Sequence, residues 1–166
     1  MSNHRIVRCY DYVNRPYDAV RSLLHRSPGA AIGSATNSAA ARSNELAGSL
    51  KIELRGIELG VKVTVHVRSV VDDEGVAGLS PATRVSIGWE ATHAPSLFPL
   101  MAGQLSAWPL TSTETQIELE GEYIPPLGAL GVAVNAAVGH RIAEASVRRF
   151  VEDVVQHIRD ELPANR

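Results

Sequence analysis

Hydrophobic and polar residues alternate along much of the chain, and this alternation predicts most of its strands. Hydrophobic side chains occupy every second position from 57 to 67, and a shorter run at 50–55 has the same period. The Arg-Gly pair at 55–56 predicts a two-residue turn, and the resulting hairpin places Leu54 opposite Ile57 on one face. Such regular alternation is typical of an antiparallel sheet with one buried and one solvated face.

Four other segments complete the predicted sheet. Residues 4–13 place apolar side chains among polar ones near the start of the chain. Residues 85–91 and 117–123 alternate strictly, whereas 99–110 alternates less regularly. Together with the hairpin, these segments predict a curved antiparallel sheet of about six strands.

Three further segments predict helices. Residues 14–16, Asn-Arg-Pro, open the first, because proline is favoured at the first helical position. Residues 27–43 are rich in Ala, Ser and Gly and predict a weak helix, broken or loosened near Gly33 and Asn37. The helical pattern of 130–162 predicts a long C-terminal helix of about 45 Å. Its apolar stripe requires that it lie across the sheet.

The segment 27–43 has two interpretations. It carries little apolar bulk, and a segment with few packed contacts opens easily. A movable lid over a binding cavity is the functional interpretation, and a plain surface helix is the alternative.

Composition narrows the class of protein. The chain has 166 residues, enough for one domain over 1–166, and is 45% hydrophobic but only 5% aromatic, so any cavity wall would be mainly aliphatic. The net charge of −2 and the absence of a basic cluster argue against nucleic-acid binding. The single cysteine, Cys9, excludes a disulfide framework and a multi-cysteine metal site. A polar N-terminus and the lack of a long apolar run predict a cytoplasmic protein with no membrane span.

The order of these elements resembles the START/Bet v 1-like superfamily, also called SRPBCC or helix-grip proteins. Two segments carry the resemblance further: residues 89–105, and the join GEYIPPLGALG at 121–131 that leads into the long helix. The resemblance is to bacterial members of unassigned function and covers nearly the whole chain. It implies an α+β fold in which the sheet wraps around the C-terminal helix, with two short helices after the first strand.

The resemblance also implies a cavity under the long helix that binds apolar molecules such as lipids or polyketides. We therefore expect a small apolar ligand, without a cofactor or metal. The residues expected to touch it lie on the inward rows and on the long helix: Val63, Val65, Val85, Ile87, Trp89, His93, Leu105, Leu119, Tyr123, Val134, Val138 and Ile142.

Histidines are the first candidates for acid–base chemistry. His93 follows a strand and is predicted at the cavity rim, whereas His66 alternates with the apolar row and should face solvent. His140 precedes Glu144 by four residues on the long helix, and His157 precedes Glu161 in the same way. With no third ligand nearby in sequence, these are expected to be surface pairs. His25 has no marked partner.

A row of acids on one strand has a similar explanation. Glu118, Glu120 and Glu122 alternate with the apolar row, so they are expected on the wet outer face of the sheet, opposite basic residues on the neighbouring strand. Paired catalytic carboxylates are therefore not predicted there.

Three functions remain open from the sequence. The first is the apolar-ligand binder. The second is an enzyme of the cyclase, aromatase or dehydratase type that uses the same cavity, with His93, Tyr123 or an acid not singled out by the sequence as its acid–base group. The third is a protein-interaction module with a packed core. A homodimer is compatible with each.

Overall fold

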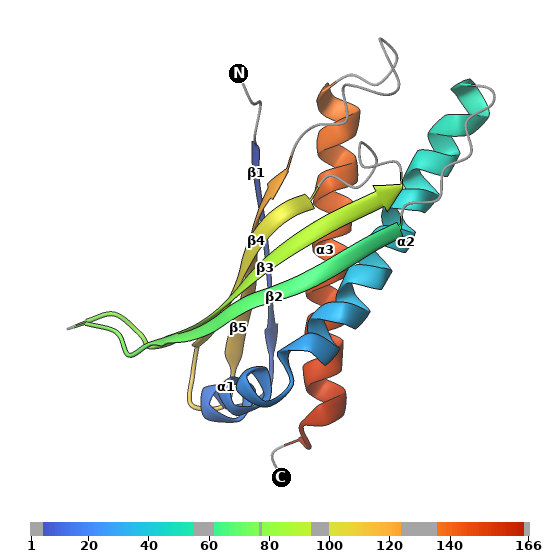
Figure 1. The fold of residues 1–166 in the computed structure, drawn as a ribbon. Helices are drawn as coiled ribbons and strands as arrows, with labels where there is room; N and C mark the ends of the chain where they lie inside the picture. The colour runs from blue at the N-terminus through green and yellow to red at the C-terminus, as the bar shows by residue number, and fades with distance from the viewer. Residues whose placement is uncertain (1–4, 55–61, 77, 94–99, 124–135, 165–166) are drawn as a thin grey trace.

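The computed structural model describes residues 5–54, 62–76, 78–93, 100–123 and 136–164 (Figure 1). The elements are β1 (Arg5–Val13), α1 (Tyr17–Arg26), α2 (Pro28–Leu54), β2 (Lys62–Asp73), β3 (Ala82–His93), β4 (Leu100–Pro109), β5 (Thr115–Tyr123) and α3 (Ala136–Glu161). The described strands form a five-stranded antiparallel sheet in the order β1-β5-β4-β3-β2. The α+β helix-grip prediction is confirmed, with five described strands in place of about six.

The predicted strand at 50–54, the first arm of the hairpin, is wrong, and the predicted turn at 55–56 lies outside the described residues. Leu50, Ile52 and Leu54 lie in the last turns of α2, and β2 begins at Lys62. The alternation at 50–55 was interpreted as a strand, but Leu50 and Leu54 are four residues apart and therefore also fit one face of a helix. A run of six residues is too short to separate the two periods.

Helix α2 is neither short nor broken. Its 27 residues continue through Gly33 and Asn37. One face of the helix is buried, and its members are Ala31, Ile32, Ala35, Thr36, Ala39 and Ala40. Small side chains let a helix approach its neighbour closely, and α2 packs against α3. The hydroxyls of Ser34 and Ser38 both donate to the Asp153 carboxylate on α3, at 3.1 and 3.0 Å.

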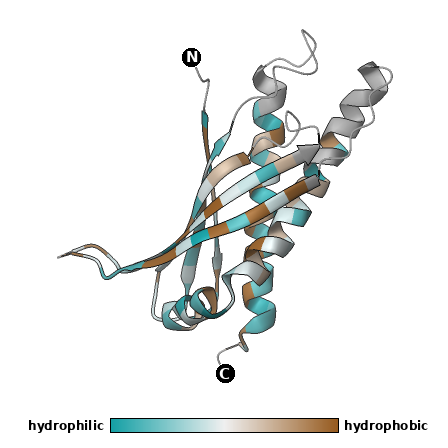
Figure 2. Cartoon of the chain, in the orientation of Figure 1, coloured by the Kyte–Doolittle hydropathy of each residue, from teal (hydrophilic) through white to brown (hydrophobic). Residues whose placement is uncertain are grey.

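The core lies between the sheet and the two long helices, and alternation along the strands decides which side chains enter it (Figure 2). Trp89 meets Phe150 of α3 edge-to-face, with ring centroids 5.6 Å apart. The Trp89 indole N–H donates to the hydroxyl of Thr36 on α2 at 3.0 Å. Gly103 makes room for this indole, because a Cβ there would lie 2.9 Å from two of its ring carbons. Trp89 therefore joins the sheet to both long helices.

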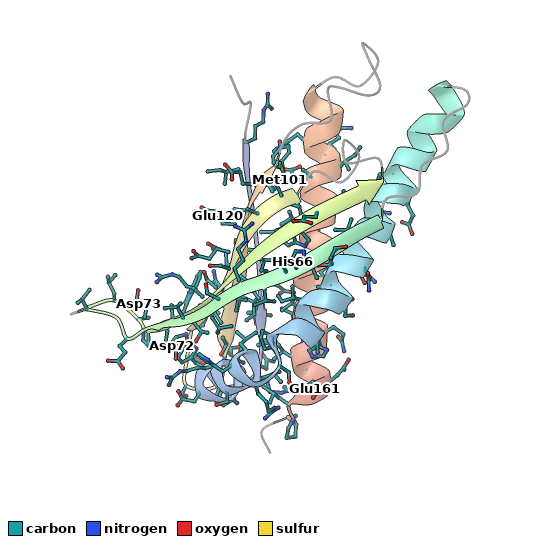
Figure 3. The ribbon with its side chains drawn as sticks, viewed as in Figure 1. His66, Asp72, Asp73, Met101, Glu120 and Glu161 are labelled. Carbon is teal, nitrogen blue, oxygen red and sulfur yellow. The ribbon has the colours of Figure 1, made fainter. Side chains whose placement is uncertain are left out.

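The outer face of the sheet is polar, as expected. Glu120 projects from it, and Arg8 of β1 pairs with both Glu120 and Glu118 (Figure 3). His66 is also on this face and lies 3.8 Å from Glu90. The acid row is thus confirmed as a solvated surface with a cross-strand cation.

A polar cluster around Asp72 fixes α1 to the β2–β3 hairpin (Figure 3). The Asp72 carboxylate accepts from Arg21 Nε at 2.9 Å and from the Thr83 hydroxyl at 2.8 Å. His25 Nε2 lies 3.0 Å from the same carboxylate, so His25 has a partner that the sequence did not indicate. Tyr17 completes the cluster through Thr83, at 2.9 Å. The Arg21 guanidinium holds the pKa of Asp72 well below its usual range.

This cluster predicts a dependence of stability on pH. Since folding lowers the Asp72 pKa, its stabilisation is complete above the ordinary carboxyl pKa of about 3.9 and is lost as the pH falls further. We expect Asp72→Asn to lower the Tm by about 2–4 °C at pH 7. The difference from the wild type should shrink in thermal unfolding as the pH is lowered from 4 to 3. Glu74→Gln makes the same charge change in the adjacent turn and serves as the control; an Asp72→Asn difference that is as large at pH 3 as at pH 7 would contradict the assignment.

Candidate functional site

The candidate site lies at one end of the molecule, where β2 and β4 begin, β3 and β5 end, and α3 begins. We call it the upper end (top in Figure 1). Strand register places Val65 of β2 beside Trp89 of β3, and Leu100 of β4 beside Tyr123 of β5. These four side chains form one row across the inner face of the sheet at this end.

Below that row the inner face is filled. Val85, Leu105 and Leu119 have no exposed surface, and Ile87 is 1% exposed. Zero exposure means that no space large enough for a water molecule touches these side chains. A ligand that touched them would therefore have to displace packed atoms.

The edge of the inner face at β2 is different. Val63, Val65 and Val67 point inward against the core but keep part of their surface exposed, and so does Ala91 of β3. Trp89, beside Val65, is 5% exposed. This edge is an apolar surface on the inner face that the helices leave partly uncovered.

The remaining predicted contacts divide into two groups. Ile142 of α3 is buried, with 4% exposure. His93 is the last residue of β3 and Val138 lies in the first turn of α3, but their side chains fall outside the part of the chain that is described. Val134 also lies outside it. Whether these predicted residues touch a ligand stays a prediction.

Tyr123, His140 and Glu144 form a polar chain at the upper end. The Tyr123 hydroxyl lies 2.7 Å from His140 Nδ1, and the two rings are stacked with centroids 6.1 Å apart. On the other side of the imidazole, Nε2 lies 3.1 Å from the Glu144 carboxylate. Tyr123 has no exposed surface, whereas the side chains of His140 and Glu144 are 43% and 57% exposed. These three interacting side chains thus extend from the buried inner face to solvent.

Sequence reasoning found all three residues and missed the contact between Tyr123 and His140. The spacing of His140 and Glu144 predicted their pair, and the inward row predicted that Tyr123 is buried. No local pattern joins Tyr123 to His140, which is 17 residues away. Only the packing of α3 on β5 brings them together.

A second feature is a charged groove of about 700 Å³ on the outer side of the α2–α3 pair. Its lining includes Arg42 and Glu45 of α2, which pair at 2.9 Å, and Arg141, Glu144 and Arg149 of α3. The groove mixes both signs of charge. Among the described residues, no three metal-ligating side chains lie close enough together to hold an ion.

A scan against protein-family models finds no match, and a search of the curated proteins also finds none. Solved structures do match. The Zhui aromatase/cyclase from Streptomyces sp. R1128 is 14% identical with a TM-score of 0.44, and the match covers 98% of each chain.

Two other solved structures are similar in the same way. Norcoclaurine synthase from Thalictrum flavum, in complex with dopamine and hydroxybenzaldehyde, is 10% identical with a TM-score of 0.37 over 96% of this chain and 89% of that one. Ara h 8.0201 is 7% identical with a TM-score of 0.39 over 94% and 98%. The chain has a helix-grip fold. This follows from the order of its own elements and the pairing of its own strands. At such low sequence identities, the similar structures assign no function.

Within the described part of this helix-grip protein, no helix combines the length and the hydrophobicity needed to cross a membrane.

Proposed function

We propose that this helix-grip protein binds a small apolar molecule at the upper end, between the inner face of β2 and β3 and the long helices. One observation supports the proposal: Val63, Val65, Val67 and Ala91 keep exposed surface on the inner face, whereas inward side chains nearer the middle of the sheet, such as Val85 of β3 and Leu105 of β4, are fully buried. When a ligand covers such an apolar surface beside a packed core, binding is favourable because the surface is removed from water.

The expected ligand follows from the lining. The wall is aliphatic apart from Trp89, whose indole N–H is already bonded to Thr36. Affinity would then come mainly from buried apolar area, at about 25 cal/mol per Å² before the costs of association. A lipid-like or polyketide-like molecule meets this description.

The first test is native mass spectrometry of freshly purified protein, followed by thermal-shift assays with a panel of medium-chain fatty acids and naphthalene derivatives. The proposal expects a co-purified apolar compound, or stabilisation by members of the panel. A protein that is free of ligand and is not stabilised by any compound would contradict it and would favour the interaction module.

A matched pair of variants locates the site. Val65→Phe adds a ring to the partly exposed inner surface, so it should weaken binding of any compound found by roughly tenfold or more. Thr64→Phe adds the same ring to the exposed outer face of the same strand and should leave affinity unchanged. Equal affinities for the two variants, measured by isothermal titration calorimetry, would place the ligand elsewhere.

A further inference from the structure

The two edges of the sheet differ in how they are protected. Strand order makes β1 and β2 the edge strands, each paired on one side only. The ladder of β2 has register shifts between Lys62 and Val63 and between Val67 and Ser69, and α2 packs against this strand. The ladder of β1 runs over nine residues without a shift, and β1 contains no lysine or proline. Because bulges, lysines and prolines prevent strand pairing at an edge, β1 is the edge suited to accept another strand.

The free edge of β1 borders an open groove. The groove has a volume of about 420 Å³, and its walls are residues 8–11 of β1 and Arg148, Val151 and Glu152 of α3. Helix α3 therefore packs against β1 without closing off this stretch of its edge. A strand that approaches from outside finds room beside residues 8–11.

Three large side chains on the outer face of β1 are exposed. Ile6 and Tyr10 are each 67% exposed, and Tyr12 is 52% exposed. They alternate with the buried Val7 and Val13, so they share one face of the strand. Apolar and aromatic side chains that stay exposed together are typical of a surface that another protein chain covers.

The backbone groups of Arg8, Tyr10 and Tyr12 point toward this edge. In an antiparallel strand the N–H and C=O of one residue point to the same side, and the side alternates along the chain. The Tyr12 carbonyl accepts from Arg159 of α3 at 3.2 Å, and the Tyr12 N–H donates to the Asp11 carboxylate at 2.7 Å. Since both contacts lie outside the ladder with β5, Tyr12 directs its backbone groups away from β5, and so do Tyr10 and Arg8. The groups of Tyr12 are used, whereas those of Arg8 and Tyr10 have no strand beside them.

We propose that a second copy of this chain pairs its own β1 with this edge, antiparallel and about a two-fold axis at Cys9. In this register Arg8 lies opposite the partner's Tyr10, and Tyr10 lies opposite the partner's Arg8, so the backbone groups of both residues are paired. The guanidinium of Arg8 meets an aromatic ring, and Ile6 meets the partner's Tyr12; both are favourable cross-strand pairs. The dimer joins the two sheets into one.

The two neighbouring registers are less favourable. A register centred on Arg8 places this residue opposite the partner's Arg8, and like charges directly opposite each other are destabilising. A register centred on Tyr10 pairs Arg8 with the partner's Tyr12, whose backbone groups already bond to Arg159 and Asp11. Pairing about Cys9 avoids the repulsion and keeps the central hydrogen bonds.

Cys9 reports this register directly. At the two-fold axis it lies opposite the partner's Cys9 in a pair without backbone hydrogen bonds, at a Cα separation of about 4.5 Å, within the range of a disulfide. Oxidation by diamide, which takes up both thiol protons and two electrons, should therefore give a covalent dimer on non-reducing gels. Burial raises the pKa of the Cys9 thiol, so the reaction is run at about pH 9.

Cys9→Ser combined with Tyr10→Cys is the matched control. It moves the thiol by one residue to a more exposed position, where the two copies of residue 10 lie about 8 Å apart in the proposed register. This exceeds the reach of a disulfide, about 7 Å between Cα atoms. We expect little covalent dimer from this variant. As much dimer as from the wild type would show random collision and would overturn the register.

Sedimentation under reducing conditions measures association without the disulfide. One strand pair buries less area than a standard interface, so we expect a reversible dimer with a Kd of roughly 10–100 μM. Tyr10→Lys places a second cation opposite the partner's Arg8 and should raise the Kd about tenfold. Thr64→Lys adds the same side chain to the exposed outer face of the other edge strand and should leave the Kd unchanged.

Two results would overturn the proposal. One is a protein that stays monomeric up to about 500 μM and gives no covalent dimer through Cys9. The other is a dimer whose Kd is the same in Tyr10→Lys and in the wild type, which would place the contact on another face. Circular dichroism spectra confirm that each variant is folded. The ligand experiments above are independent of this outcome.

Discussion

Phe150→Ala is expected to lower the free energy of unfolding by about 3–5 kcal/mol. Phe150 has no exposed surface and lies at the centre of the interface between α3 and the sheet. Its ring meets Trp89 edge-to-face at a centroid distance of 5.6 Å. The substitution removes a large buried side chain, leaves a cavity, and deprives the indole of its aromatic neighbour.

The cavity is expected to stay largely open, because the surrounding positions cannot collapse. Gly103 lies under the indole, whose position the hydrogen bond to Thr36 holds. Urea unfolding monitored by circular dichroism measures the loss. Arg149→Ala changes the exposed neighbour on the same helix and should stay within about 0.5 kcal/mol of the wild type. A loss of less than about 1 kcal/mol for Phe150→Ala would mean that the Phe150 ring contributes little to the packing between α3 and the sheet.

Ala39→Leu should produce the second large effect, a loss of about 1–3 kcal/mol or more. Ala39 is fully buried on α2, on a face made mostly of alanine. A leucine adds volume that the closely packed helix cannot accept without moving away from the core. The expected loss follows from overpacking, since leucine itself is a good helix former.

The same change tests the two interpretations of α2. A lid that opens freely would tolerate a larger side chain at Ala39, whereas a structural helix would not. Asn37→Leu is the matched control, because position 37 is exposed and receives the same side chain. Thermal unfolding should separate the two variants by several degrees, and equal Tm values would restore the lid interpretation.

The sequence predicted the faces of the sheet well. The inward row of Val85, Ile87 and Trp89 and the outward row of Glu118 and Glu120 lie where alternation placed them. Side-chain direction in a strand depends only on odd or even position, so it can be read without knowledge of the partner strands. The buried apolar stripe of α3 was predictable in the same way, because the helical period of 3.6 residues determines which side chains share a face.

Helix α2 shows where this reasoning fails. Its buried face is made mostly of alanine, which looks like weak anchoring when hydrophobic bulk is counted. Small residues are suited to this place because α3 lies close beside it, and the two serines find Asp153 there. Helix α2 is also longer than predicted. It extends to Leu54, although the alternation at 50–55 had indicated a strand there.

Local periodicity in the sequence thus determined the secondary structure of most segments, the side of the sheet that is buried, and the helix-grip order of elements. Only the tertiary structure decided that Tyr123 meets His140, that His25 and Arg21 meet Asp72, and that the inner face is filled below the upper end. The physical reason is that periodicity fixes the direction of a side chain relative to its own element. Its partners, and the space left between them, depend on how distant elements pack.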